Sequence, residues 1–133
     1  MKKVILIFTI SLISFQAMSQ EKDNSNSFNP NFVHTVFFWL HNPDSAEDRE
    51  AFESALKQLL KDSKYTKTNY IGTAPKAIRD VVDDSFTYKL IVTFESNEEQ
   101  ELYQGEEAHL KFIVDANHLW KKVIVYDAIE LGD

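Results

Sequence analysis

Between residues 32 and 129 the chain alternates apolar stretches with amphipathic ones. Four stretches are rich in the β-branched and aromatic residues that favour strands, and they cover residues 32–41, 68–73, 86–95 and 120–129. Asn42-Pro43 ends the first stretch, and Gly72 and Pro75 close the second; such residues interrupt strands. The pattern therefore predicts four strands.

After the first predicted strand the apolar residues take up a helical period. They recur at i, i+3, i+4, i+7 and i+8, which places them on one helix face: Phe52, Ala55, Leu56, Leu59 and Leu60. Asp44 and Ser45 are suitable N-caps, and Glu47 and Asp48 suit a first helical turn. We therefore expect an amphipathic helix of about four turns here.

A second helical region follows the third predicted strand. Ser96 and Glu99 have the spacing of a capping box, which starts a helix that we expect to run to Gln104. Gly105 interrupts this helix, and a second helical piece covers residues 106–117. The element order is thus βαββαβ, typical of an α+β, ferredoxin-like fold with a four-stranded antiparallel sheet and helices on one face.

The predicted strands are apolar on both faces. Alternation along the first strand separates two apolar sets: Val33, Phe37 and Trp39 on one face, and Val36, Phe38 and Leu40 on the other. In the third strand Phe86 and Leu90 share a face, whereas Ile91 lies on the opposite one. In the last strand the paired sets are Val123 with Val125, and Ile124 with Tyr126.

Two helices can cover only one face of such a sheet, so the other apolar face needs a partner. The partner we favour is a second copy of the chain, packed sheet to sheet as a dimeric α+β barrel with a cavity between the protomers. The alternative is a monomer whose second face is covered by the long connection from Ala74 to Ser85, whose secondary structure the pattern leaves undecided.

Residues 1–19 have the order of a secretory signal peptide. Met1-Lys2-Lys3 is followed by an apolar run over residues 4–13 and by Ala17-Met18-Ser19, which presents small residues for cleavage. The alternative, a retained membrane anchor, is disfavoured because the run is shorter than a membrane span. We expect cleavage near Ser19 and Gln20, export to the periplasm or beyond, and no stable membrane insertion. Residues 20–31 are polar and predict a flexible leader to a domain over residues 32–133.

Composition excludes several classes of function. The formal net charge is −7, and loss of Lys2 and Lys3 with the signal peptide takes it to −9. Because nucleic acids and anionic membrane surfaces bind basic proteins, this charge argues against both as partners. Absence of cysteine excludes disulfides, a cysteine nucleophile and thiolate metal sites. No histidine spacing typical of a metal site, no glycine-rich phosphate loop and no nucleophile elbow is present.

Histidine and tyrosine are therefore the residues left to carry chemistry. His34 lies on the first strand, on the face of Phe38, and His109 shares a helix face with Phe112. Tyr103 precedes His109 by six residues, and Tyr88 lies on the third strand. A histidine in an apolar pocket has a lowered pKa and serves as a base near neutral pH. The alternative is that all of these side chains only fill the core.

Four segments together resemble the stress-responsive A/B barrel (Dabb) domain family. They are VHTVFFWL, TYKLIVTFES, YQGEEAHLKFI and WKKVIVYD, within residues 32–129, and they include a histidine early in the first strand and a Y-x5-H-x2-F run. The family fold is the dimeric α+β barrel. Its best understood relatives are plant polyketide cyclases that close a ring by aldol condensation without metal or cofactor.

The resemblance implies roles for individual residues. His109 matches the general base, Tyr103 the tyrosine that orients a substrate carbonyl, and His34 the histidine of the first strand. Tyr88 stands where the cyclases have a further histidine, and Glu106 stands where the family often has the first histidine of an H-P-x-H run.

We therefore expect an exported homodimer that binds a small apolar or aromatic molecule in its barrel, through His34, Phe38, Tyr88 and Phe112. The alternative is a cofactor-free lyase or cyclase acting on a carbonyl substrate, with His109 as base and Tyr103 as hydrogen-bond donor. A third reading, haem or quinone handling, rests only on the barrel architecture shared with monooxygenases, and no residue argues for it specifically.

Overall fold

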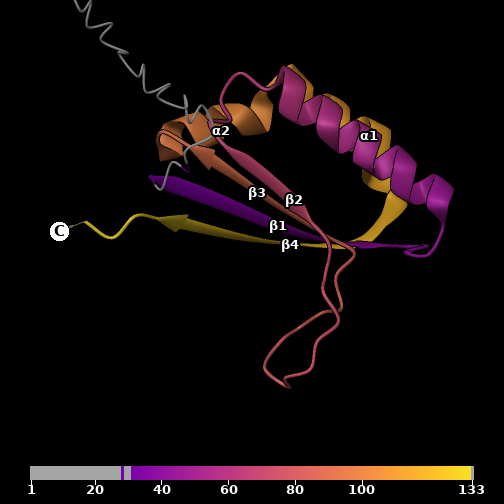
Figure 1. Cartoon of the computed structure of the whole chain (residues 1–133). Coiled ribbons are helices and arrows are strands. Elements are labelled where there is room, and N and C mark those ends of the chain that lie inside the picture. The colour runs from indigo at the N-terminus through magenta and orange to yellow at the C-terminus, as the bar shows by residue number, and fades with distance from the viewer. Residues whose placement is uncertain (1–27, 29–30, 133) are drawn as a thin grey trace, which may run out of the picture.

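The elements of the fold follow one another in the predicted order. The computed structural model describes Phe28 and residues 31–132, so the predicted signal peptide and nearly all of the predicted leader lie outside the described residues. The elements are β1 (Phe32–Leu40), α1 (Ala46–Asp62), β2 (Asn69–Gly72), β3 (Tyr88–Phe94), α2 (Asn97–Gly105), α3 (Glu107–Ala116), a 3₁₀ turn (Asn117–Leu119) and β4 (Trp120–Ile129) (Figure 1).

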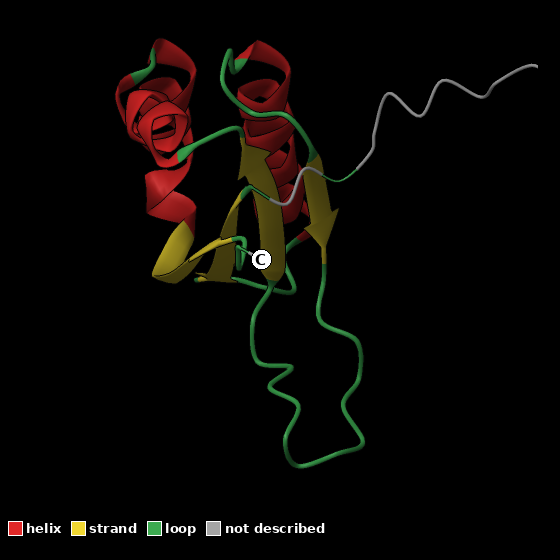
Figure 2. Cartoon of the chain, turned by 90° about the vertical axis from the view of Figure 1, so that its left-hand side faces the viewer, coloured by secondary structure: helices red, strands yellow, loops and turns green. Residues whose placement is uncertain are grey.

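The four strands form one antiparallel sheet in the order β2-β3-β1-β4. All the helices lie on one face of this sheet, with α1 beside α3, and the other face carries no helix (Figures 1 and 2). The predicted ferredoxin-like α+β fold is thus confirmed. β1 is a central strand, because it pairs with β3 on one side and β4 on the other.

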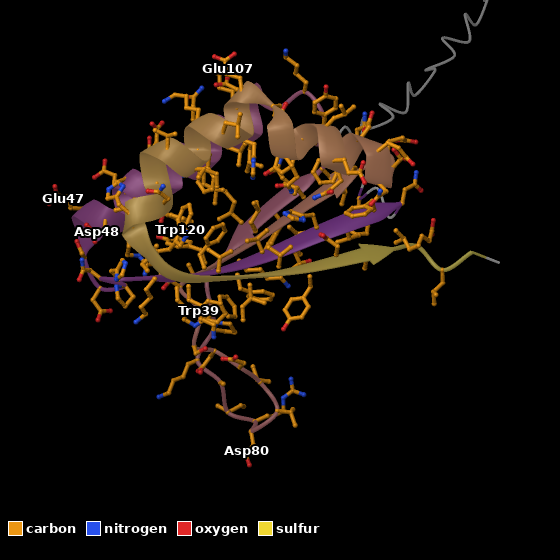
Figure 3. All side chains as sticks on the ribbon, turned by 180° about the vertical axis from the view of Figure 1, so that it is seen from behind. Trp39, Glu47, Asp48, Asp80, Glu107 and Trp120 are labelled. Atoms are coloured by element: carbon orange, nitrogen blue, oxygen red, sulfur yellow. The ribbon has the colours of Figure 1, made fainter. Side chains whose placement is uncertain are left out.

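Side chains of β1 alternate between the two faces as predicted. Every second residue is buried against the helices, starting from Phe32 and ending at Leu40, and the residues between them are only partly buried. Trp39, on the open face, lies on the opposite side of the sheet from Trp120, which points towards the helices (Figure 3). Strand β1 therefore contributes alternate side chains to the core and to the open face.

The core is centred on aromatic rings from four elements. Phe38 of β1 packs edge-on to Phe52 of α1 at 5.0 Å between ring centroids, and Phe112 of α3 stacks on Trp120 at 5.5 Å. Helix α1 is capped by Ser45, whose hydroxyl accepts the backbone N–H of Asp48, as expected for an N-cap. These contacts fix the helix layer over the sheet.

The second helical region breaks one residue later than predicted. Ser96 accepts the backbone N–H of Glu99, as expected, but the residue with extended backbone is Glu106 (φ −71°, ψ 152°), and Gly105 ends α2 without a positive φ. Glu106 is held in place because one of its carboxylate oxygens accepts the backbone N–H of Lys64 at 3.0 Å. The break thus depends on a tertiary contact as well as on the glycine.

Residues 73–87 form a long connection that projects away from the sheet (Figures 1 and 2). Ile78 and Val81 on it are 93% and 88% exposed. Only its last part meets the open face: Ser85 accepts a hydrogen bond from Trp39, and Phe86 packs on Phe37 at 4.9 Å. Placing Phe86 on the face of Leu90 was therefore wrong, because the alternation starts only at Tyr88. The connection does not cover the open face.

The open face stays largely apolar. It presents side chains of β1, β3 and β4, among them Phe37, Ile91, Ile124 and Tyr126, and Tyr126 packs on Phe37 at 6.1 Å. None of the described helices is both long and apolar enough to cross a bilayer.

Candidate functional site

A cavity of about 360 Å³ lies between the sheet and the helices. Its floor is the helix-facing side of β1 and β4, its walls come from α2 and α3, and Leu59 of α1 closes it. We expected a cavity between two protomers, but this one lies within a single chain, on the side of the sheet opposite the open face. Its volume is near the lower end of the usual range for ligand pockets, and most of the side chains that line it are apolar.

The sheet register determines which side chains form the floor. His34, Val36 and Phe38 of β1 stand opposite Asp127, Val125 and Val123 of β4. Paired residues in an antiparallel sheet share a face, so these three pairs all point towards the helices. Val123 and Val125 are partly exposed although they face the helices, so the cavity opens along the β4 edge.

Asp127 forms the closest polar contact in the cavity, with His34. One carboxylate oxygen lies 2.5 Å from Nδ1 of His34. A carboxylate accepts, so Nδ1 carries the proton and a neutral ring keeps its free lone pair on Nε2. Sequence reasoning missed Asp127. Its position could have identified it: strand residues alternate between faces, so this acidic residue falls on the same face as the apolar Val123 and Val125.

Tyr103 lies between the two histidines of the cavity. Its ring centroid is 6.1 Å from that of His34 and 4.6 Å from that of His109. The side chain is only 1% exposed, and none of the residues described hydrogen-bonds its hydroxyl. Burial raises the pKa of Tyr103, and the Glu106 carboxylate raises it further. The hydroxyl is therefore protonated at neutral pH and available to donate to a ligand.

His109 is half-buried on α3 and points into the same cavity. Its Nδ1 lies 3.1 Å from the backbone carbonyl oxygen of Gln104, which can only accept, so Nδ1 donates and Nε2 holds the lone pair. Burial lowers the pKa of His109 below its usual 6.5, and the nearby His34 lowers it further, against opposing contributions from Gln104 and Glu106. His109 is thus a neutral proton acceptor near pH 7.

The remaining predicted ligand-binding residues divide between cavity and core. Phe38 and Phe112 line the cavity. Tyr88 does not: it stacks on Phe52 at 4.9 Å and donates from its hydroxyl to Glu53 at 2.6 Å. Burial, together with that bond to Glu53, raises the pKa of Tyr88 to about 12. The structure therefore brings His34, Tyr103, His109, Phe38 and Phe112 together and leaves Tyr88 outside.

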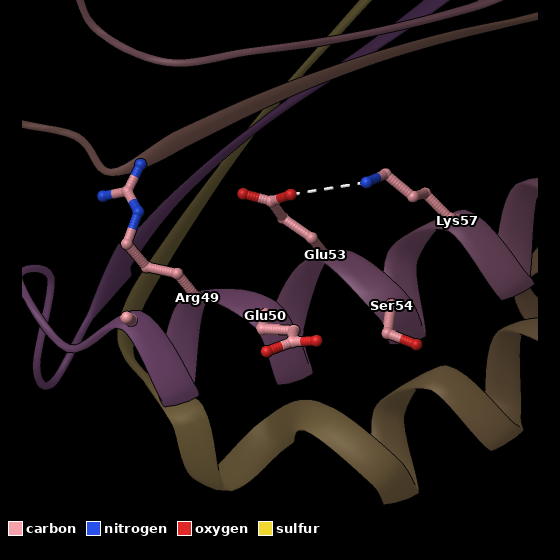
Figure 4. A pocket seen from close by; sticks show the side chains of 6 residues that line it. Arg49, Glu50, Glu53, Ser54 and Lys57 are labelled. Carbon is pink, nitrogen blue, oxygen red and sulfur yellow. Dashed lines mark hydrogen bonds and ion pairs between the residues drawn. The ribbon is translucent and has the colours of Figure 1, made fainter.

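A wider hollow of about 510 Å³ lies along α1 (Figure 4). Three of its four charged side chains, those of Arg49, Glu53 and Lys57, already have partners. Glu53 pairs with Lys57 at 3.3 Å, and Arg49 donates to the carbonyl of Pro43 and covers the ring of Tyr88. Across the described residues, no group of three or more His, Asp or Glu side chains is placed to hold a metal ion. The cavity with His34 and His109 is therefore the better candidate site.

Comparison with known proteins decides the family. The sequence profile of the stress responsive A/B barrel domain, Dabb, matches residues 32–130. The chain belongs to the Dabb family. No protein with a curated description matches the sequence of this Dabb chain.

Solved structures share its fold. The hydroxynitrile lyase from Passiflora edulis is 20% identical, with a TM-score of 0.66 over 79% of this chain and 98% of the lyase. A Dabb protein of ferredoxin-like fold from Mesorhizobium loti is 19% identical, with a TM-score of 0.64 over 76% and 97%. A dimeric ferredoxin-like protein of unknown function from Thermobifida fusca is 13% identical, with a TM-score of 0.61 over 80% and 98%. At such identities the likeness shows the fold alone.

The lowered pKa of His109 predicts how stability changes with pH. Because the folded chain disfavours the charged imidazole, the unfolded chain binds the proton more readily just below pH 6.5. The contribution of His109 to the free energy of unfolding is therefore complete above pH 6.5 and is lost as the pH falls through the lower, folded pKa. Urea unfolding at a series of pH values should show a steeper loss below pH 6.5 for the wild type than for His109→Gln. Parallel curves for the two proteins would contradict this assignment.

Proposed function

We propose that this Dabb domain binds a small apolar or aromatic molecule with a carbonyl group in the cavity between its sheet and helices. The observation that carries the proposal is the hydroxyl of Tyr103: the side chain is nearly buried at the wall of a mostly apolar cavity, and no described residue hydrogen-bonds its hydroxyl. Buried polar groups normally have a partner, so a ligand oxygen is the natural acceptor. Phe38 and Phe112 supply apolar surface for the rest of the molecule.

The arrangement around Tyr103 also supports proton transfer. His109 presents Nε2 as a proton acceptor, and a hydrogen bond from Tyr103 to the carbonyl oxygen would stabilise the negative charge that forms there when a neighbouring C–H is deprotonated. His34, oriented by Asp127, is a second group that can hold a proton. We therefore propose a cofactor-independent lyase or cyclase activity as the alternative to simple binding. The shared fold of the Passiflora hydroxynitrile lyase agrees with it.

We also propose that the chain works as a homodimer through its open sheet face. No helix covers that face and the long connection reaches only part of it, and structural neighbours from Thermobifida fusca and Bacteroides fragilis are described as dimeric. The signal-like segment of residues 1–19 supports export to the periplasm or beyond, with cleavage near Ser19 and Gln20.

Removal of the Tyr103 hydroxyl should weaken ligand binding. We expect Tyr103→Phe to lower the affinity for propiophenone, an aromatic ketone, by about five- to tenfold, the usual value of one hydrogen bond. Calorimetric titration measures the change. Tyr88→Phe is the matched control, since it removes a hydroxyl that bonds Glu53 outside the cavity, and it should leave the affinity unchanged. Equal effects of the two substitutions would refute the role of Tyr103.

Proton transfer can be tested by isotope exchange on the same ketone. In D₂O the wild type should accelerate exchange of the protons next to the carbonyl of propiophenone, and His109→Gln should lose about 10²-fold or more of that acceleration while still binding the ketone. NMR follows the exchange. If the wild type binds propiophenone and exchanges its protons no faster than buffer does, the domain is a binding module for such ketones and the lyase alternative fails.

A charge on the open face should dissociate the proposed dimer. Ile124 lies on that face, opposite Phe37 of β1, so Ile124→Lys would place an ammonium in an apolar interface. Sedimentation should show a dimer for the wild type at micromolar concentration and a monomer for this variant. Val114→Lys, on the exposed outer side of α3, should remain dimeric. A monomeric wild type would end the proposal.

A further inference from the structure

The two ends of the cavity differ in polarity. At one end lie His34 and Asp127, and the next floor pairs, Val36 with Val125 and Phe38 with Val123, are apolar. Strands rise about 3.3 Å per residue, so the polar pair lies roughly 13 Å from the last pair along the floor. Trp120 continues the apolar end. A molecule that fits this lining has its polar groups at one end and an apolar tail.

Gln100 adds a polar group at the helix wall. It lies on α2 three residues before Tyr103, so the two side chains share a helix face, and both line the cavity. Gln100 is 8% exposed, yet its side-chain amide has no hydrogen bond to any described residue. Among the described residues, Oε1 of Glu106 is the one fully buried side-chain nitrogen or oxygen without a hydrogen bond. Both amide atoms of Gln100 therefore keep some accessible surface, and the side chain that carries them lines the cavity.

The chemistry of Gln100 narrows the class of ligand. An amide both donates and accepts, as a hydroxyl does, and no lysine or arginine is among the described residues that line the cavity. Asp127 instead places a carboxylate at the polar end, which disfavours an anionic ligand. A neutral hydroxyl close to the carbonyl is the group that fits both Gln100 and its surroundings.

We propose that Gln100 is a specificity-determining residue that hydrogen-bonds a hydroxyl next to the ligand carbonyl, so that the cavity selects neutral hydroxy-ketones with an apolar or aromatic tail. This inference rests on the proposed function, because it takes Tyr103 as the donor to the carbonyl. Tyr103 then hydrogen-bonds the carbonyl oxygen and Gln100 the neighbouring hydroxyl of the same molecule. The tail of that molecule extends towards Phe112 and Trp120.

Two probes of nearly equal volume test the inference. Phenacyl alcohol carries a hydroxyl where propiophenone carries a methyl group, and the two ketones are otherwise identical. Wild type should bind phenacyl alcohol about tenfold more tightly than propiophenone by calorimetric titration. Gln100→Met should abolish this preference by weakening phenacyl alcohol about tenfold, with propiophenone changed less than twofold. Gln58→Met, on the exposed side of α1, is the matched control and should keep the wild-type preference.

The outcomes separate this inference from the function on which it rests. If wild type binds both probes with equal affinity, or Gln100→Met lowers the affinity for both equally, Gln100 does not hydrogen-bond the hydroxyl. The inference is then overturned, while ketone binding stands. If neither probe binds to wild type, ketone binding and the inference fall together. A measurement on wild type alone covers the case of an unstable variant: the side-chain amide NMR signal of Gln100 should shift clearly farther with phenacyl alcohol than with propiophenone, and equal shifts would contradict the inference.

Discussion

Alternation of side chains along β1 is the constraint on which the rest of the structure depends. The strand is hydrogen-bonded on both edges, so each of its residues must face either the helices or the open side of the sheet. The helix-facing set carries Phe38 into the aromatic core and His34 to the polar end of the cavity. The other set carries Phe37 and Trp39 to the open face. A shift of one residue would exchange the side chains of the core and cavity with those of the open face.

The chemistry of the cavity follows from burial. Tyr103 and His109 are taken out of water by the same helix layer that packs on Phe38 and Phe112, so the phenol keeps its proton and the imidazole stays neutral. Nδ1 of His109 donates to a backbone carbonyl and Nδ1 of His34 donates to Asp127, so Nε2 is the ring nitrogen that stays free of these bonds in each histidine. The fold thus supplies a donor and acceptors beside apolar surface, which suits a ketone better than an ion.

Local patterns were enough to predict what depends on neighbours in the sequence. The strand β1, the N-cap of α1 at Ser45 and the N-cap of α2 at Ser96 all follow from spacing within one element. Properties set by contacts between distant segments were not predictable in this way. Asp127 meets His34 only through the register of β4 on β1, and Tyr88 leaves the cavity because α1 places Phe52 and Glu53 against it. The cavity itself was expected between protomers, because a sequence shows which faces are apolar but not how far the helices stand from the sheet.

A crystal structure of the full domain with propiophenone tests the central claim most directly, because it shows both where the ketone lies and how it is oriented. The account predicts the ketone inside one chain, its oxygen within hydrogen-bond distance of the Tyr103 hydroxyl and its ring against Phe112 and Trp120. A ketone bound at the open faces of two chains, or one with its ring at the His34 end of the cavity, would contradict it.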